Sequence, residues 1–162
     1  MAIKILSVKK CHLLQEDPTF QVRERLIQEV YNMRRLNASQ HPNFPVLLAY
    51  DTKSVPYHLI TVFERWGDLL QFVRMSRERN PYVQPMHLLR MLMDVSDALS
   101  YLELLGLVHR AVMAANVLVG ENFVCKLSGL HSLRRLTGGT SKQGSSLKLH
   151  IETLTNLRTV LD

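Results

Sequence analysis

Three positions in the sequence carry side chains that could do chemistry. Lys4 lies in an alternating apolar run, Glu29 in a stretch with helical spacing, and the pair His109-Arg110 beside a short apolar segment. Ammonium, carboxylate and imidazole groups can stabilise charge or transfer protons when a fold brings them together. Taken singly, each group has an ordinary structural role as a solvated strand charge, a surface carboxylate or a loop residue. Their order and spacing must therefore decide what they do.

The first part of the chain predicts a small sheet and one long helix. Residues 2–8 alternate in the strand sense, and residues 46–50 and 57–63 are two apolar segments joined by a polar loop. Residues 17–37 begin with Asp-Pro, a helix-start signal, and continue with apolar residues at helical spacing. Glu29 would lie in this helix.

The second part predicts two helices and a hairpin. Residues 69–77 indicate a short helix, and residues 86–105 indicate a long one that Gly106 terminates. Residues 117–119 and 124–127 are two short strands at hairpin spacing. The apolar residues of the long helix form one stripe, and its opposite, polar face is expected to carry Arg90, Asp94 and Asp97.

Composition excludes several classes of function. The 162 residues are 46% hydrophobic and 21% charged, as in one globular domain, and no run approaches the length of about 18 apolar residues that a membrane span needs. The net charge of +6 is spread evenly along the chain, which argues against a nucleic-acid-binding stripe. Cys11 and Cys125 lack the spacing of zinc ligands, and a disulfide framework is not expected, so a reducing setting is the default.

The order of these elements resembles a protein kinase catalytic domain. The resemblance rests on a strand with AIK, a helix with Glu and Met four residues apart, HPN, ITVFE, GDLLQFV and the run LVHRAVMAANVLVGENFVCKLSGL. These segments cover residues 1–136, and GDLL with AANVL is most similar to receptor tyrosine kinases. The resemblance implies an α+β fold with two lobes, here incomplete at both ends, because no glycine-rich loop and no APE motif is present.

The resemblance also implies how ATP would be held. In kinases a strand lysine holds the α- and β-phosphates and pairs with a helix glutamate, and Lys4 and Glu29 match these positions. Thr61 matches the gatekeeper beside the hinge. The full set of implied nucleotide-binding residues is Ala2, Lys4, Glu29, Thr61, Val62, Phe63, Glu64, Asn116 and Leu118. Kinases also contain a stack of side chains that braces an active-like arrangement of the two lobes. The residues that match this stack are Met33, Leu47, His109 and Leu130.

Two carboxylates that kinases use are missing. Ala111 replaces the aspartate of the HRD motif, and a methyl group cannot accept the proton of a substrate hydroxyl, a loss that costs about 10² to 10⁴ in rate. Gly129 replaces the aspartate of the DFG motif, which leaves Asn116 as the single, weak ligand for Mg²⁺. Ala115 replaces the arginine of the tyrosine-kinase loop. We therefore expect no intact catalytic set.

These features predict a pseudokinase, a catalytically impaired tyrosine-kinase-type domain that acts as a protein-binding or allosteric module. It would keep residual ATP binding, with weak or no Mg²⁺ binding. Its expected partners are other signalling proteins or kinases, and its expected setting is the cytoplasm, including the intracellular part of a membrane-bound parent. Two alternatives stay open: an ATP-binding tyrosine kinase with weak phosphotransfer activity, and a truncated fragment without a function.

The same alignment predicts three parts of the chain. Residues 1–66 would form a partial N-lobe. Residues 67–136 would form a partial C-lobe with the catalytic loop and the degenerate metal motif. Residues 137–162 are expected to form a Gly/Ser/Thr-rich loop and a terminal helix.

Overall fold

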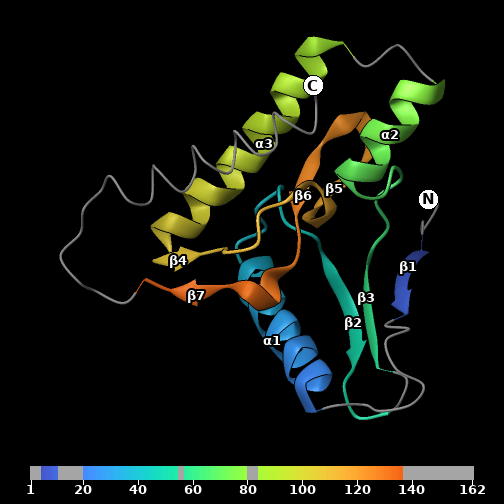
Figure 1. Cartoon of the computed structure of the whole chain (residues 1–162). Coiled ribbons are helices and arrows are strands. Elements are labelled where there is room, and N and C mark those ends of the chain that lie inside the picture. Colours follow the sequence, from blue (N-terminus) through green and yellow to red (C-terminus); the bar gives the residue numbers. More distant parts are fainter. Residues whose placement is uncertain (1–4, 11–19, 55–56, 80–83, 137–162) are drawn as a thin grey trace.

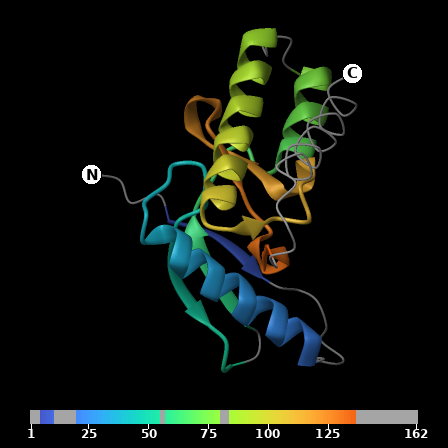
Figure 2. The same cartoon turned by 90° about the vertical axis from the view of Figure 1, so that its left-hand side faces the viewer.

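The computed structural model describes residues 5–10, 20–54, 57–79 and 84–136, and these residues form a mixed α and β fold (Figure 1). Figures 1 and 2 place a small sheet and α1 at one end, α2 and α3 at the other, and short strands between them. The elements, in chain order, are β1 (Ile5–Lys10), α1 (Phe20–Asn37), β2 (Leu47–Asp51), β3 (His58–Val62), α2 (Leu69–Arg79), α3 (Pro85–Leu104), β4 (Leu107–Val108), β5 (Val117–Val119), β6 (Cys125–Leu127) and β7 (Arg134–Arg135), with 3-10 turns η1 (Ala114–Asn116), η2 (Glu121–Phe123) and η3 (Leu130–Ser132).

The sheet is antiparallel and has the order β1-β3-β2, so β3 is its central strand. Thr61 on β3 pairs with Leu47 on β2 and with Ser7 on β1. The end of α1 is fixed to this sheet because Leu47 donates its backbone N–H to Asn37 Oδ1 at 3.2 Å. The strands expected at 46–50 and 57–63 are therefore confirmed within one residue at each end.

One face of α1 is buried. Val30, Met33 and Leu36 recur at every third residue, and all three are buried. Arg34 and Arg35 lie in the last turn, where positive charge stabilises the helix dipole. The helix ends at Asn37, as expected, whereas its expected start signal lies outside the described residues.

The two remaining helices follow a polar break. Asp68 caps α2, because its Oδ1 accepts the backbone N–H of Gln71 at 2.9 Å. Of the stripe predicted on α3, Val95, Leu99 and Leu102 are buried, while Leu88 and Leu92 are half-buried. Gly106, with φ +65°, ends the helix, and its N–H donates to Glu103 O at 2.8 Å. The placement of Asp94 on the polar face is wrong: the side chain is half-buried, and Oδ2 accepts the N–H of Cys125 at 2.8 Å.

A single buried cluster connects the helices to the hairpin. The cluster includes residues from α1, α2, α3, β5 and β6. The turn at residues 41–43 extends into it, where Asn43 Nδ2 donates to Cys125 O at 2.9 Å and Leu127 N donates to Asn43 O at 2.8 Å. The hairpin β5–β6 forms as predicted, whereas the two-residue pair β4–β7 was not predicted. The boundary expected between the two partial lobes, at residues 66 and 67, stays a prediction. Both residues are hydrogen-bonded to Val119.

We predict that Asp68→Ala lowers the free energy of unfolding by about 1 kcal/mol, because the first turn of α2 loses its capping acceptor. Urea unfolding at neutral pH measures this change. Asp68→Asn keeps a side-chain oxygen at the cap and serves as the control, with stability close to that of the wild type. Equal stability of the wild type and Asp68→Ala would contradict the capping role.

Candidate functional site

The segment 109–111 forms a tight loop between β4 and η1. His109 is buried, its Nδ1 accepts the backbone N–H of Ala111 at 3.2 Å, and its Nε2 lies 2.9 Å from Ser128 O. Since a backbone N–H can only donate, the proton of the neutral ring must be on Nε2. Burial lowers the pKa of His109 to about 4, against an opposing effect of the bond to Ser128. His109 therefore acts as a neutral structural link between two loops.

Ala111 presents no acid or base. Its carbonyl oxygen accepts a hydrogen bond from Asn116 Nδ2 at 2.8 Å. On α3, Asp94 Oδ2 accepts the backbone N–H of Cys125. Asp97 is exposed on the same helix, and its charge raises the pKa of His41 against the larger lowering effect of burial. Of the carboxylates on α3, Asp94 is thus already held by a hydrogen bond to β6.

Gly129 and Asn116 are packed against each other. Gly129 has φ +78°, a left-handed conformation that favours glycine. A Cβ atom built on Gly129 would lie 2.9 Å from Asn116 Cγ and Nδ2 and 3.1 Å from Oδ1. The Asn116 amide therefore occupies the space into which any longer side chain at position 129 would extend.

Glu29 binds the turn that follows Gly129. Oε1 accepts the N–H of Leu130 at 3.0 Å, while Oε2 accepts the N–H of His131 and lies 3.1 Å from His131 Nδ1. One turn further along α1, Asn32 Nδ2 donates to Leu130 O at 2.7 Å. Lys4 lies outside the described residues, so its pairing with Glu29 stays a prediction.

The expected hinge is joined to the hairpin. Glu64 is buried, and its Oε1 lies 2.8 Å from Lys126 Nζ on β6. A Cβ atom on Gly120 would overlap Glu64 Oε2, so a larger residue at this position would require the Glu64 carboxylate to move. Trp66 N donates to Val119 O at 3.0 Å.

Four of the other expected nucleotide-binding residues lie on or directly after β3 and on β5. Thr61 and Val62 are half-buried on β3, and the N–H of Val62 donates to Val46 O at 3.0 Å. Phe63 is exposed, and Leu118 is half-buried on β5. Ala2 lies outside the described residues, and Ala115 is exposed.

The stack of bracing side chains is largely buried. Met33 and Leu130 belong to the main buried cluster, and Leu47 packs against it. His109 adjoins this cluster through its bond to Ser128. Sequence reasoning missed three polar partners of the site. Asn32 could have been found from its spacing, because it lies one helical turn from Glu29. Lys126 and His131 stand at recognisable positions, three residues before and two residues after Gly129, but their partners could not be read from the sequence.

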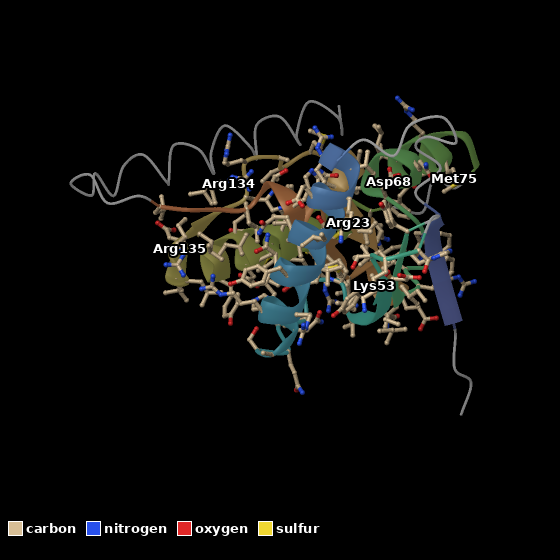
Figure 3. All side chains as sticks on the ribbon, turned by 90° about the horizontal axis from the view of Figure 1, so that it is seen from below. Arg23, Lys53, Asp68, Met75, Arg134 and Arg135 are labelled. Atoms are coloured by element: carbon tan, nitrogen blue, oxygen red, sulfur yellow. The ribbon has the colours of Figure 1, made fainter. Side chains whose placement is uncertain are left out.

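A separate hollow of about 500 Å³ lies beside the turn 130–132. Its lining residues come from α1, the catalytic loop and the segment after Gly129: Glu24, Arg25, Gln28, Arg110, His131, Ser132 and Arg134. Figure 3 shows Arg134 on the side of α1 opposite to Asp68 and Met75. Of the expected nucleotide-binding residues that the structure describes, none lines this hollow.

Within residues 5–10, 20–54, 57–79 and 84–136, no group of three or more His, Cys, Asp or Glu side chains could hold a metal ion. No helix in this part of the chain is long and apolar enough to span a membrane.

Comparisons with known proteins agree with the geometry. The family model described as "Protein tyrosine and serine/threonine kinase" matches residues 3–152. The chain is 34% identical over 139 residues to "Tyrosine-protein kinase transforming protein Abl" of Abelson murine leukemia virus, covering 86% of this chain and 18% of that protein. It is 34% and 33% identical to "Tyrosine-protein kinase ABL2" of Mus musculus and Homo sapiens, covering 80% and 86% of this chain and 10% and 11% of those proteins. The chain thus spans less than a fifth of the length of these relatives.

We predict that acid destabilises the fold through His109. Its pKa in the folded state, about 4, is below the ordinary 6.5, so the unfolded chain binds a proton that the folded chain excludes. Stability is therefore fully present above pH 6.5 and is lost as pH falls toward 4, by about 3 kcal/mol from this residue. Urea unfolding at several pH values between 7 and 4 measures the loss.

The control for this titration is His109→Gln, which keeps an N–H donor for Ser128 but has no group that titrates. The variant is expected to lose less stability than the wild type over the same pH range. Parallel pH profiles for the two proteins would show that His109 does not carry the effect.

Proposed function

Because the chain belongs to the protein tyrosine and serine/threonine kinase family, we propose that it is a catalytically impaired tyrosine-kinase-type domain that acts by binding other signalling proteins. Such a pseudokinase would regulate a partner, including another kinase, through its surface. Its setting would be the cytoplasm or the intracellular part of a membrane-bound parent. Residues 1–66 and 67–136 would correspond to parts of the two kinase lobes.

The packing of Asn116 against Gly129 is the observation that carries this proposal. Kinases hold Mg²⁺ with a carboxylate and an asparagine, and Mg²⁺ requires hard oxygen ligands in near-ideal geometry. Here position 129 offers no side chain, and the amide of Asn116 is bonded through its NH₂ group to Ala111 O. These residues therefore do not fit the family's metal site.

The missing base supports the same proposal. At position 111 a methyl group replaces the group that would accept the proton of a substrate hydroxyl. Asp94 is bonded to the backbone of Cys125 and cannot serve without breaking that contact. Both the metal ligand and the base would have to be supplied by other residues for phosphotransfer to proceed.

We propose residual ATP binding because Lys4 and residues 62–64 match the phosphate-binding lysine and the adenine-binding hinge of kinases. The implied ATP-binding residues are Ala2, Lys4, Glu29, Thr61, Val62, Phe63, Glu64, Asn116 and Leu118. Hinge backbone groups would meet the adenine, while Ala2 and Leu118 would lie on its two faces. Lys4 would bind phosphate oxygens as a point charge.

A binding role is supported by the buried core. Met33, His109 and Leu130 are each no more than 2% exposed. Because these side chains are packed in one arrangement, the surface around them is held in a fixed shape. A fixed surface lowers the entropic cost of binding a partner protein.

We predict that the purified chain transfers no phosphate from ATP to a tyrosine-containing peptide, because the base and the metal carboxylate are both absent. Radiolabelled ATP with Mg²⁺ or Mn²⁺ measures the transfer, and a complete tyrosine kinase domain serves as the positive control. The signal should equal that of Lys4→Met. Peptide phosphorylation that Lys4→Met abolishes would contradict the proposal and favour a weakly active kinase.

We also predict that nucleotide binding is nearly insensitive to Mg²⁺. A fluorescent ATP analogue titrated in Mg²⁺ and in EDTA should give dissociation constants within threefold of each other, and Lys4→Met should weaken binding at least tenfold. Tightening by tenfold or more in Mg²⁺ would show that a metal site remains. Absence of any binding would contradict the residual ATP site.

A further inference from the structure

Two side chains on the same face of α1 grip one peptide turn. Glu29 and Asn32 are three residues apart, so they lie one above the other on the helix. Glu29 accepts the N–H groups of Leu130 and His131, and Asn32 donates to the carbonyl oxygen of Leu130. Three backbone polar groups of the turn are thereby satisfied by a single helix. Because Glu29 and Asn32 both bind this turn, they restrict the position and the rotation of α1.

The side chain of His131 adds a fourth contact. Its Nδ1 lies 3.1 Å from Glu29 Oε2, the oxygen that also accepts the His131 N–H. A carboxylate has about four acceptor sites, so three of those on Glu29 are occupied by residues 130 and 131. The kinase motif has glycine at this position, which has no side chain to make this contact. The orientation of the Glu29 carboxylate is therefore set from within the turn.

The hydrogen bonds of Glu29 and Asn32 to the turn lie next to buried side chains. Glu29 is 14% exposed, whereas Leu130 and Met33 are almost completely buried beside it. The hydrogen bonds are shielded from water on this side, and a carboxylate in such a place needs its partners. His131 lies at the rim, with its side chain 40% exposed. Substitution of His131 therefore removes one contact without opening the core.

We propose that Glu29, Asn32 and His131 form a lock that holds α1 against the turn 130–132 without nucleotide, and that the position of α1 does not depend on Lys4. In kinases the ion pair between the strand lysine and the helix glutamate must be in place for activity. In this chain the Glu29 carboxylate already contacts three groups of the turn, which are the N–H of Leu130 and the N–H and Nδ1 of His131. The lock is independent of the proposed function, because it concerns the position of a helix and not phosphotransfer.

Hydrogen exchange of the full chain, measured by mass spectrometry without nucleotide, tests the lock. The readout is the exchange of backbone amides in residues 22–37, with α3 as the internal reference for global unfolding. We expect Lys4→Met to leave exchange in 22–37 within twofold of the wild type. His131→Gly should accelerate it at least fivefold while α3 is unchanged.

Ser132→Gly is the matched control, since it introduces the same backbone freedom one residue later in the same turn. Its exchange should stay within twofold of the wild type. The lock is contradicted if Lys4→Met accelerates α1 as much as His131→Gly does. It is equally contradicted if His131→Gly has no larger effect than Ser132→Gly.

If His131→Gly unfolds the whole chain, α3 also exchanges faster. A second pair of variants then tests the lock. His131→Asn keeps a short side-chain donor toward Glu29, whereas His131→Leu keeps apolar bulk without a donor. The lock predicts protection of α1 in His131→Asn and loss of protection in His131→Leu. Equal protection in these two variants would overturn it.

Discussion

Hydrogen bonds of Glu29 and Asn32 join α1 to the turn 130–132. Glu29 is partly withdrawn from water and must find hydrogen-bond donors there, since a desolvated carboxylate without partners is costly. The turn supplies these donors because Gly129 adopts a left-handed conformation just before it. The other end of α1 is hydrogen-bonded to the sheet, because Asn37 Oδ1 accepts the N–H of Leu47. One carboxylate thus connects the sheet to the catalytic loop and hairpin.

A second connection lies at the hinge. The ion pair of Glu64 and Lys126 is buried beside Gly120, and Trp66 is bonded to Val119. Both connections join the sheet-bearing part of the chain to the segment that contains the degenerate motifs. Glu29 and Glu64, which the resemblance to kinases assigns to the ATP site, are therefore held by contacts within the protein.

Much of the fold could be predicted because its signals are local. The stripe on α3, its end at Gly106 and the hairpin spacing of β5 and β6 are patterns within a few residues. The two-residue strands of β4 and β7 could not be predicted, because their pairing depends on segments more than twenty residues apart. Asp94 was misplaced for the same reason: helical spacing cannot reveal that a backbone N–H of β6 will satisfy it. The positions of Ala111 and Gly129 came from motif order, and the packing of Asn116 into the vacated space required coordinates.

The most direct test of this account is thermal unfolding of the chain in EDTA without nucleotide. Trp66, the single tryptophan, packs against Phe72 and Phe123 near the hinge, so its fluorescence reports on one connection, while far-UV circular dichroism reports on all helices. If protein contacts alone join the two parts, both probes should follow one cooperative transition with the same midpoint. Separate midpoints, or no cooperative transition, would contradict the claim that the connections at Glu29 and Glu64 hold the site together.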